Sequence, residues 1–267
     1  GKLCQSHGIV TVCDQPNVGK HLQDHLGINY FHLANRPTLN NVLGSWPHLI
    51  IAGVNYITRR KGPLSLGVNQ LGGLVRATPD ASRLDTQLYI NPITYSVTDN
   101  DMRRLTKPDR APGFALSFNS CRPYSAGSVY IKSADAAMPP AIHGNYLDDQ
   151  RDIKDVLRMA RFIGRMQNSP SVQKLLAAPP ETNLLALSDN EIIDDFRARS
   201  GTVFHPCGTC RMGPDRRHSV VDPQLRVHGV GKLRVADAAI FPNITSANTN
   251  APTIAVAHKA ADLILQS

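Results

Sequence analysis

The chain has 267 residues, of which 42% are apolar and 19% charged, a composition typical of a folded globular protein. This length allows one large domain or two modest ones with a substantial core. No run of about 18 apolar residues occurs, so no membrane span is predicted, and we expect a cytoplasmic protein. The chain begins with Gly1 and its first residues do not resemble a signal peptide, so we expect a fragment of a longer protein.

The net charge is +8, with a local excess of arginine and lysine between positions 151 and 165. Apolar residues recur there at helical spacing, so the excess indicates the solvated face of an amphipathic helix. A nucleic-acid patch would contain several interleaved aromatic residues, and Phe162 alone does not supply them, so we expect no nucleic-acid partner. Five cysteines at irregular spacing do not form a disulfide framework, and this favours a reducing compartment; they are Cys4, Cys13, Cys121, Cys207 and Cys210.

The predicted elements change in type along the chain. The β-branched stretch 8–12 predicts a strand that runs into a turn at 14–19. The region 26–150 is rich in Gly, Pro, Asn and Thr, and its short apolar stretches predict an antiparallel sheet with strands at 86–90, 113–118 and 127–131. Helices are predicted at 151–167 and 188–199, the second capped by Ser188 or Asp189. Strands at 220–221, 225–230 and 233–237 and a helix over 252–265 complete the chain.

The segment Phe204–Gly213 contains one histidine, two cysteines and two glycines. His205 is a candidate acid/base, since imidazole changes its charge near neutral pH, although a histidine in such a segment, taken alone, is more often a structural residue in a tight turn. Cys207 and Cys210 have the spacing of half a zinc site or of a redox dithiol. No second Cys-x-x-Cys pair is present, and we expect no metal.

Two further segments combine small and polar residues. A predicted strand ends at Asp237 and is followed by Ala238 and Ala239, which would let the backbone approach a ligand closely. The polar loop 246–253 opens the last predicted helix, whose free N–H groups and positive dipole end favour an anionic ligand atom. Simple capping would explain either segment by itself.

Taken together and in this order, the segments resemble the glucose–methanol–choline oxidoreductases over the whole chain. Residues 14–25, Asp-Gln-Pro-Asn-Val-Gly-Lys-His-Leu-Gln-Asp-His, are similar to the family's Pro-x-Val-Gly-x-Asn-Leu-Gln-Asp-His segment, with His21 in place of the more usual asparagine. Residues 204–213 resemble its catalytic-histidine segment, and 221–238 resemble its approach to the flavin. Residues 248–262 resemble its terminal helix, in the version found in choline and aliphatic-alcohol dehydrogenases.

The resemblance implies an α+β substrate domain, with an antiparallel sheet backed by helices, and the C-terminal part of an FAD-binding α/β domain. Residues 1–27 and 201–267 would belong to the FAD domain, the latter with the catalytic residues, and 28–200 to the substrate domain. The Gly-x-Gly-x-x-Gly turn that holds the FAD pyrophosphate is absent from this sequence. We therefore expect the N-terminal FAD-binding portion to be missing, and the chain alone to bind FAD poorly.

The resemblance also implies a reaction, the oxidation of a primary alcohol to an aldehyde by hydride transfer to flavin N5. His205 would accept the hydroxyl proton and Asn248 would donate a hydrogen bond to the substrate oxygen. Asp237, Ala238, Asn248, Thr249 and Asn250 match positions that contact FAD. The other partners would be a small-molecule alcohol and an electron acceptor, either oxygen or a quinone-type molecule.

Three alternatives remain open from the sequence. The scaffold could serve non-redox flavin chemistry, as in the family's hydroxynitrile lyases. The chain could be a non-catalytic half that acts only with a partner chain. A zinc or thiol site at Cys207 and Cys210 is the third.

Overall fold

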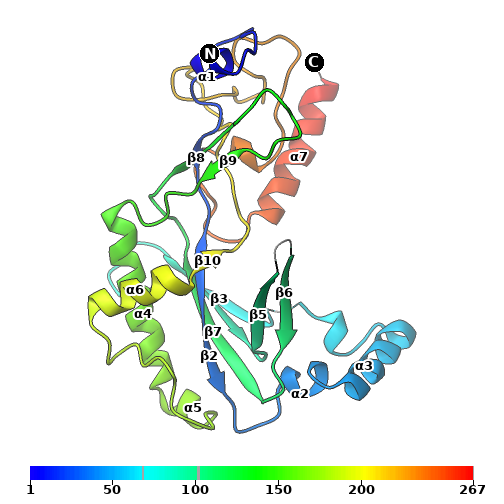
Figure 1. The fold of residues 1–267 in the computed structure, drawn as a ribbon, viewed down its shortest axis with the longest axis vertical. Coiled ribbons are helices and arrows are strands. Elements are labelled where there is room, and N and C mark those ends of the chain that lie inside the picture. The colour runs from blue at the N-terminus through cyan, green and yellow to red at the C-terminus, as the bar shows by residue number, and fades with distance from the viewer. Residues whose placement is uncertain (68, 101–102, 267) are drawn as a thin grey trace. The chain divides into compact units, whose positions relative to one another are not determined.

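The computed structural model describes residues 1–67, 69–100 and 103–266, and it divides into two compact units (Figure 1). Unit 1 consists of Gly1–Leu26, Ser120–Lys154 and Thr202–Ser267, and unit 2 of Gly27–Asn119 and Asp155–Gly201. The chain therefore leaves and re-enters each unit. No helix in the described ranges is both long and apolar enough to cross a membrane. Which unit binds FAD and which binds substrate stays a prediction.

Unit 2 is built on a mainly antiparallel sheet with the order β10-β2-β7-β4-β3. Its strands are β2 (Leu26–Leu33), β3 (Leu71–Val75), β4 (Thr86–Asn91), β7 (Gly113–Ser120) and β10 (Gly201–Thr202), beside a separate hairpin of β5 (Tyr95–Asn100) and β6 (Arg103–Pro108). β2 pairs antiparallel with β7 from Gly27↔Asn119 to Leu33↔Gly113, and β3 pairs antiparallel with β4. Every residue of β7 except the last is buried, so this strand is the centre of the core.

Helices cover the sheet of unit 2, as Figure 1 shows for α4 and α6. The helical elements are α2 (Leu39–Leu43), α3 (Trp46–Arg59), η1 (Pro63–Ser65), α4 (Gln150–Gln167), α5 (Pro170–Gln173) and α6 (Asp189–Arg199). Tyr30 on β2, Phe118 on β7 and Phe196 on α6 form one stack, with ring centroids 6.2 and 5.9 Å apart, and each is at most 2% exposed. Aromatic burial of this extent holds the helix to the sheet. The predicted antiparallel sheet backed by helices is therefore confirmed.

Unit 1 has little regular structure apart from its last helix. Its elements are α1 (Lys2–Ser6), β1 (Lys20–Leu22), β8 (Gly127–Tyr130), β9 (Ala141–His143), η2 (Ala238–Ile240) and α7 (Asn250–Leu265), with the sheet order β1-β8-β9. A hydrophobic core cluster of this unit lies in its C-terminal segment and contains Cys207, Val220, Val221, Leu225, Ile240, Phe241, Ile244 and Ala260. Long loops over such a core require specific turns and side-chain hydrogen bonds, because few ladder bonds are available.

Two glycines make the close approaches of unit 1 possible. Gly19 has φ +80°, and a Cβ there would lie 2.1 Å from the carbonyl oxygen of Val129. Gly208 has φ +86°, and a Cβ there would lie 2.5 Å from the carbonyl oxygen of His21. Only glycine fits both the backbone conformation and the space at these positions.

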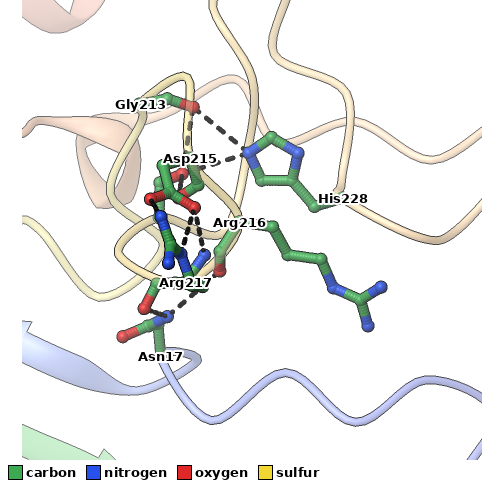
Figure 2. A network of polar contacts seen from close by, with 7 residues as sticks. Asn17, Gly213, Asp215, Arg216, Arg217 and His228 are labelled. Atoms are coloured by element: carbon green, nitrogen blue, oxygen red, sulfur yellow. Dashed lines mark hydrogen bonds and ion pairs between the residues drawn. The ribbon is translucent and has the colours of Figure 1, made fainter.

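The turn around Asn17 is joined to the loop 213–217 by a polar network (Figure 2). The Asn17 side-chain amide donates to the carbonyl oxygens of Arg217 at 3.1 Å and Arg216 at 3.5 Å. Within the loop, Asp215 forms an ion pair with Arg217. From outside the loop, His228 Nε2 lies 3.1 Å from the carbonyl oxygen of Gly213. The first and last segments of unit 1 are thus held together by hydrogen bonds to backbone carbonyls.

The strand predicted at 8–12 is wrong. The described chain forms helix α1 just before it, and 8–12 is irregular, with Val10 and Val12 87% and 91% exposed. β-branched residues favour a strand only where a neighbouring strand offers pairing and a packed face, and neither is supplied to this stretch.

The strands predicted at 220–221, 225–230 and 233–237 are reduced to isolated bridges, Val221↔Val227 and Arg226↔Arg234 among them. Leu225, Gly229 and Lys232 have φ of 66°, 80° and 61°. Each positive φ turns the chain out of the pleat, so the alternating pattern produces tight turns over the core.

Candidate active site

The segment with Asp24 and His25 runs beside the segment with His205. The backbone N–H of Gln23 donates to Cys207 O at 3.0 Å, and that of Cys207 donates to Gln23 O at 2.9 Å. The N–H of Val203 donates to His25 O at 3.1 Å. This short antiparallel pairing places the two histidines opposite each other, although 180 residues separate them in the chain.

Asp24 is 7% exposed and fixes the backbone of the His205 segment. Its Oδ1 accepts the His205 backbone N–H at 2.9 Å. Its Oδ2 accepts the Tyr146 hydroxyl at 2.6 Å and also the Thr202 hydroxyl. Since three donors from two other chain segments converge on one carboxylate, Asp24 acts as the anchor of this site.

Four groups of the site follow one another in a row of polar contacts. His25 Nε2 lies 3.1 Å from the carbonyl oxygen of Cys121, and His25 Nδ1 lies 3.0 Å from His205 Nδ1. His205 Nε2 in turn lies 3.1 Å from Asn248 Nδ2. The two imidazole rings meet edge to face, with centroids 5.2 Å apart and an interplanar angle of 83°. The predicted pair, His205 and Asn248, is thus brought together.

Burial sets the protonation of these histidines. His25 is fully buried and His205 is 9% exposed. Burial lowers the pKa of both imidazoles, and for His205 the nearby Asp24 carboxylate opposes this only in part. Both rings are therefore neutral at physiological pH, and a neutral imidazole is the form that can accept a proton.

The residues predicted to contact FAD lie around the beginning of α7 and η2. Asp237 is exposed and caps η2 by accepting the Ala239 N–H at 2.7 Å, while the Ala238 carbonyl accepts the Gly208 N–H. Asn248 and Asn250 are exposed, and Thr249 is the N-cap residue of α7 but makes no side-chain cap. Exposed carboxamides and first-turn N–H groups are hydrogen-bond donors, so this donor set fits the carbonyl edge of a flavin.

The two cysteines of the Cys-x-x-Cys segment are packed rather than reactive. Cys207 is 2% exposed in the core of unit 1, and burial raises the pKa of its thiol to about 12. Burial also raises the pKa of the Cys210 thiol. A thiolate, which metal binding and disulfide exchange both require, is therefore disfavoured at neutral pH. In the ranges 1–67, 69–100 and 103–266, no three His, Cys, Asp or Glu side chains are grouped to hold a metal ion.

Asp24, His25 and Tyr146 belong to the site but are not predicted by the sequence patterns. Asp24 and His25 close the Leu-Gln-Asp-His motif, which indicates the family but, by itself, no role for these two residues. A polar pair that ends such a motif was a usable signal for the site. Tyr146 lies in no motif, and only the fold brings its hydroxyl to Asp24.

Comparisons with known proteins identify the family of this chain. A family model described as GMC oxidoreductase matches residues 123–257. An alcohol dehydrogenase [acceptor] from Pseudomonas putida is 39% identical over 98% of this chain and 46% of its own length. The mitochondrial choline dehydrogenase of Homo sapiens is 32% identical over 96% of this chain and 42% of its own length.

Solved structures of two oxidases have a fold similar to that of this chain. An Aspergillus oryzae formate oxidase variant, studied for FAD modification, superposes with a TM-score of 0.85 and 26% identity over 98% of this chain and 50% of that one. A pyridoxine 4-oxidase superposes with a TM-score of 0.76 and 26% identity over 100% of this chain and 47% of that one. The chain spans about half the length of these relatives.

Proposed function

This chain belongs to the GMC oxidoreductase family, and we propose that it supplies the catalytic side chains for the FAD-dependent oxidation of a primary alcohol to an aldehyde. The observation that carries the proposal is the 3.1 Å contact between His205 Nε2 and Asn248 Nδ2, at the beginning of α7. Two relatives, an alcohol dehydrogenase and a choline dehydrogenase, support an alcohol as the substrate.

His205 acts as the general base in this proposal. Its neutral Nε2 accepts the proton of the substrate hydroxyl, and its backbone is held in place by Asp24. A base placed in this way contributes about 10²–10⁴-fold to the rate. Since an asparagine carries no titratable proton, His205 alone performs the acid/base step.

Asn248 stabilises the substrate oxygen. Its carboxamide N–H points at His205 Nε2, where the hydroxyl would arrive, so it can donate to the oxygen as negative charge develops there. A donor already oriented before the reaction has little reorganisation left to do. The contribution of Asn248 is therefore orientation and charge stabilisation.

FAD, which the GMC oxidoreductases bind, would accept the hydride from the alcohol carbon when present. Asp237, Ala238, Thr249 and Asn250 are the residues of this chain proposed to hold it. The sequence contains no Gly-x-Gly-x-x-Gly turn, so we propose that tight FAD binding also needs an N-terminal dinucleotide-binding portion. Either oxygen or a quinone-type molecule would reoxidise the flavin.

The test uses the complete flavoprotein that carries this chain. A primary alcohol is added without oxygen, and flavin absorbance is followed. We expect bleaching in the wild type, and a loss of rate of about 10²-fold or more in His205→Ala at unchanged flavin content. His218→Ala, which changes an exposed histidine of the same unit, is the matched control.

Three outcomes would contradict the proposal. Unchanged absorbance with every alcohol would point to non-redox flavin chemistry. Full activity in His205→Ala would remove the assigned base. A larger loss in Asn248→Ala than in His205→Ala would mean that the two roles are reversed.

A further inference from the structure

His25 is a fully buried histidine that the proposed reaction does not use directly, yet both of its ring nitrogens have partners. One partner is the carbonyl oxygen of Cys121, at 3.1 Å from Nε2. The other is Nδ1 of His205, at 3.0 Å from Nδ1. A contact between two imidazole nitrogens is a hydrogen bond only when one of them carries a proton and the other does not.

The direction of this hydrogen bond follows from the carbonyl. A carbonyl oxygen only accepts, so His25 Nε2 must carry a proton and donate to Cys121 O. A neutral imidazole has a single N–H, so His25 Nδ1 is unprotonated and accepts. His205 Nδ1 must then be the donor.

A neutral His205 also carries a single N–H, which is at Nδ1, so its Nε2 carries no proton. This nitrogen faces Asn248 Nδ2 at 3.1 Å, and a carboxamide nitrogen only donates. The two ends of the row therefore agree: a carbonyl acceptor at Cys121 and an amide donor at Asn248 fix the same proton positions in between.

The opposite arrangement would need a charged His25. If His205 Nδ1 were the acceptor, His25 would donate from both nitrogens and would be an imidazolium. His25 is fully buried, and burial lowers its pKa against the smaller opposing effect of hydrogen bonds to the backbone of Cys121 and Thr245. The Asp24 carboxylate also opposes this lowering, but its oxygens already accept hydrogen bonds from the His205 backbone N–H, Tyr146 and Thr202. The neutral arrangement is thus the stable one.

We propose that His25 is a positioning residue that fixes His205 as the Nδ1–H tautomer and so keeps Nε2 unprotonated and able to accept a proton. The inference rests on the proposed function only in naming that proton as the hydroxyl proton of the alcohol. The tautomer of a histidine is set by the hydrogen bond of its other nitrogen. Without His25, His205 would also populate the Nε2–H tautomer, which cannot act as a base towards substrate.

A spectroscopic test reads the tautomer without flavin. The chain is labelled with ¹⁵N-histidine, and long-range ¹H–¹⁵N spectra are recorded at neutral pH for the wild type, His25→Phe and His25→Gln, with His205→Gln to assign the signals. We expect a protonated Nδ1 and an unprotonated Nε2 for His205 in the wild type. His25→Phe removes the acceptor and should add the Nε2–H form, whereas His25→Gln offers a carboxamide acceptor and donor and should restore the wild-type pattern.

The outcomes separate this inference from the proposed function. A wild-type spectrum with a protonated Nε2 overturns the inference by itself, even if no variant folds, and an unchanged pattern in His25→Phe does the same. In the complete flavoprotein, His25→Phe should lower kcat by up to about 10⁴-fold with little change in KM, and His25→Gln should recover most of it. If the tautomer is as stated but no alcohol bleaches the flavin, the proposed function fails and the inference stands.

Discussion

Replacing Asp24 with asparagine should lower the free energy of unfolding of unit 1 by about 1–2 kcal/mol. Three donors converge on this carboxylate, from the His205 backbone, the Tyr146 hydroxyl and the Thr202 hydroxyl. A hydrogen bond to a charged group contributes about 1.5–3 kcal/mol to stability, and a neutral one about 0.5–1.5 kcal/mol. Each of the three hydrogen bonds would therefore be weakened by about 1 kcal/mol when its acceptor loses the charge. The asparagine keeps the acceptor for His205 but turns an NH₂ towards the two hydroxyls. Tyr146 is 40% exposed, and removal of a buried charge is itself favourable, so the total is lower than three full losses.

The assay is urea unfolding at neutral pH, with Asp148→Asn as a control at an exposed aspartate of the same unit. Tyr146→Phe and the double variant complete a cycle. Because the 2.6 Å contact joins the two side chains directly, we expect a coupling free energy of at least about 0.5 kcal/mol. If Asp24→Asn costs no more than the control, or if the two changes are additive, the anchor role of Asp24 is refuted.

Three further predictions concern stability and reactivity. Gly208→Ala should lower the free energy of unfolding by about 2 kcal/mol or more, because Gly208 has a positive φ and the added Cβ would lie 2.5 Å from a carbonyl oxygen. Gly53→Ala, whose added Cβ would have nothing within 4 Å, should raise the free energy of unfolding by up to about 1 kcal/mol. Equal effects of the two substitutions would contradict this reasoning. Burial and the hydrogen bond to Asp195 raise the pKa of Tyr30, so the stabilisation by the neutral Tyr30 hydroxyl is present below about pH 10 and is lost above it. Tyr30→Phe should therefore reduce the loss of the free energy of unfolding between pH 9 and 11 by about 1 kcal/mol. Identical pH profiles of the variant and the wild type would show that the pKa is not raised. Iodoacetamide at pH 8 should leave Cys207 unmodified in the native chain and modify it in urea, as mass spectrometry of its peptide would report; rapid native labelling would contradict its burial.

Local signals in the sequence predicted several elements well. The helix expected at 188–199 is α6, and Ser188 caps it in a capping box with Glu191, as the pattern of a serine three residues before a glutamate indicates. The strand expected at 113–118 is β7 (Gly113–Ser120), the buried centre of the sheet. Helix caps and buried apolar strands are determined by a few consecutive residues, so they can be predicted from a short stretch of sequence.

Other features depend on contacts that no short window contains. Helix α3 was not predicted, because Ile50, Ile51, Val54 and Ile57 are β-branched and favour strands as readily as helices. At the site, the family resemblance predicted His205 and Asn248, and the structure places them together. Their catalytic and FAD-binding roles stay predictions. The contact between His25 and His205 spans 180 residues, and only the fold reveals it.

The construction of unit 1 from three separate stretches has a consequence for biosynthesis. At a translation rate of about 5–20 residues per second, His25 is synthesised roughly 10–40 s before His205. Every residue of unit 2 has been made by the time Thr202 is added. A nascent polypeptide stalled at Thr202 would therefore contain every residue of unit 2, whereas His25 of unit 1 would still lack its partner His205.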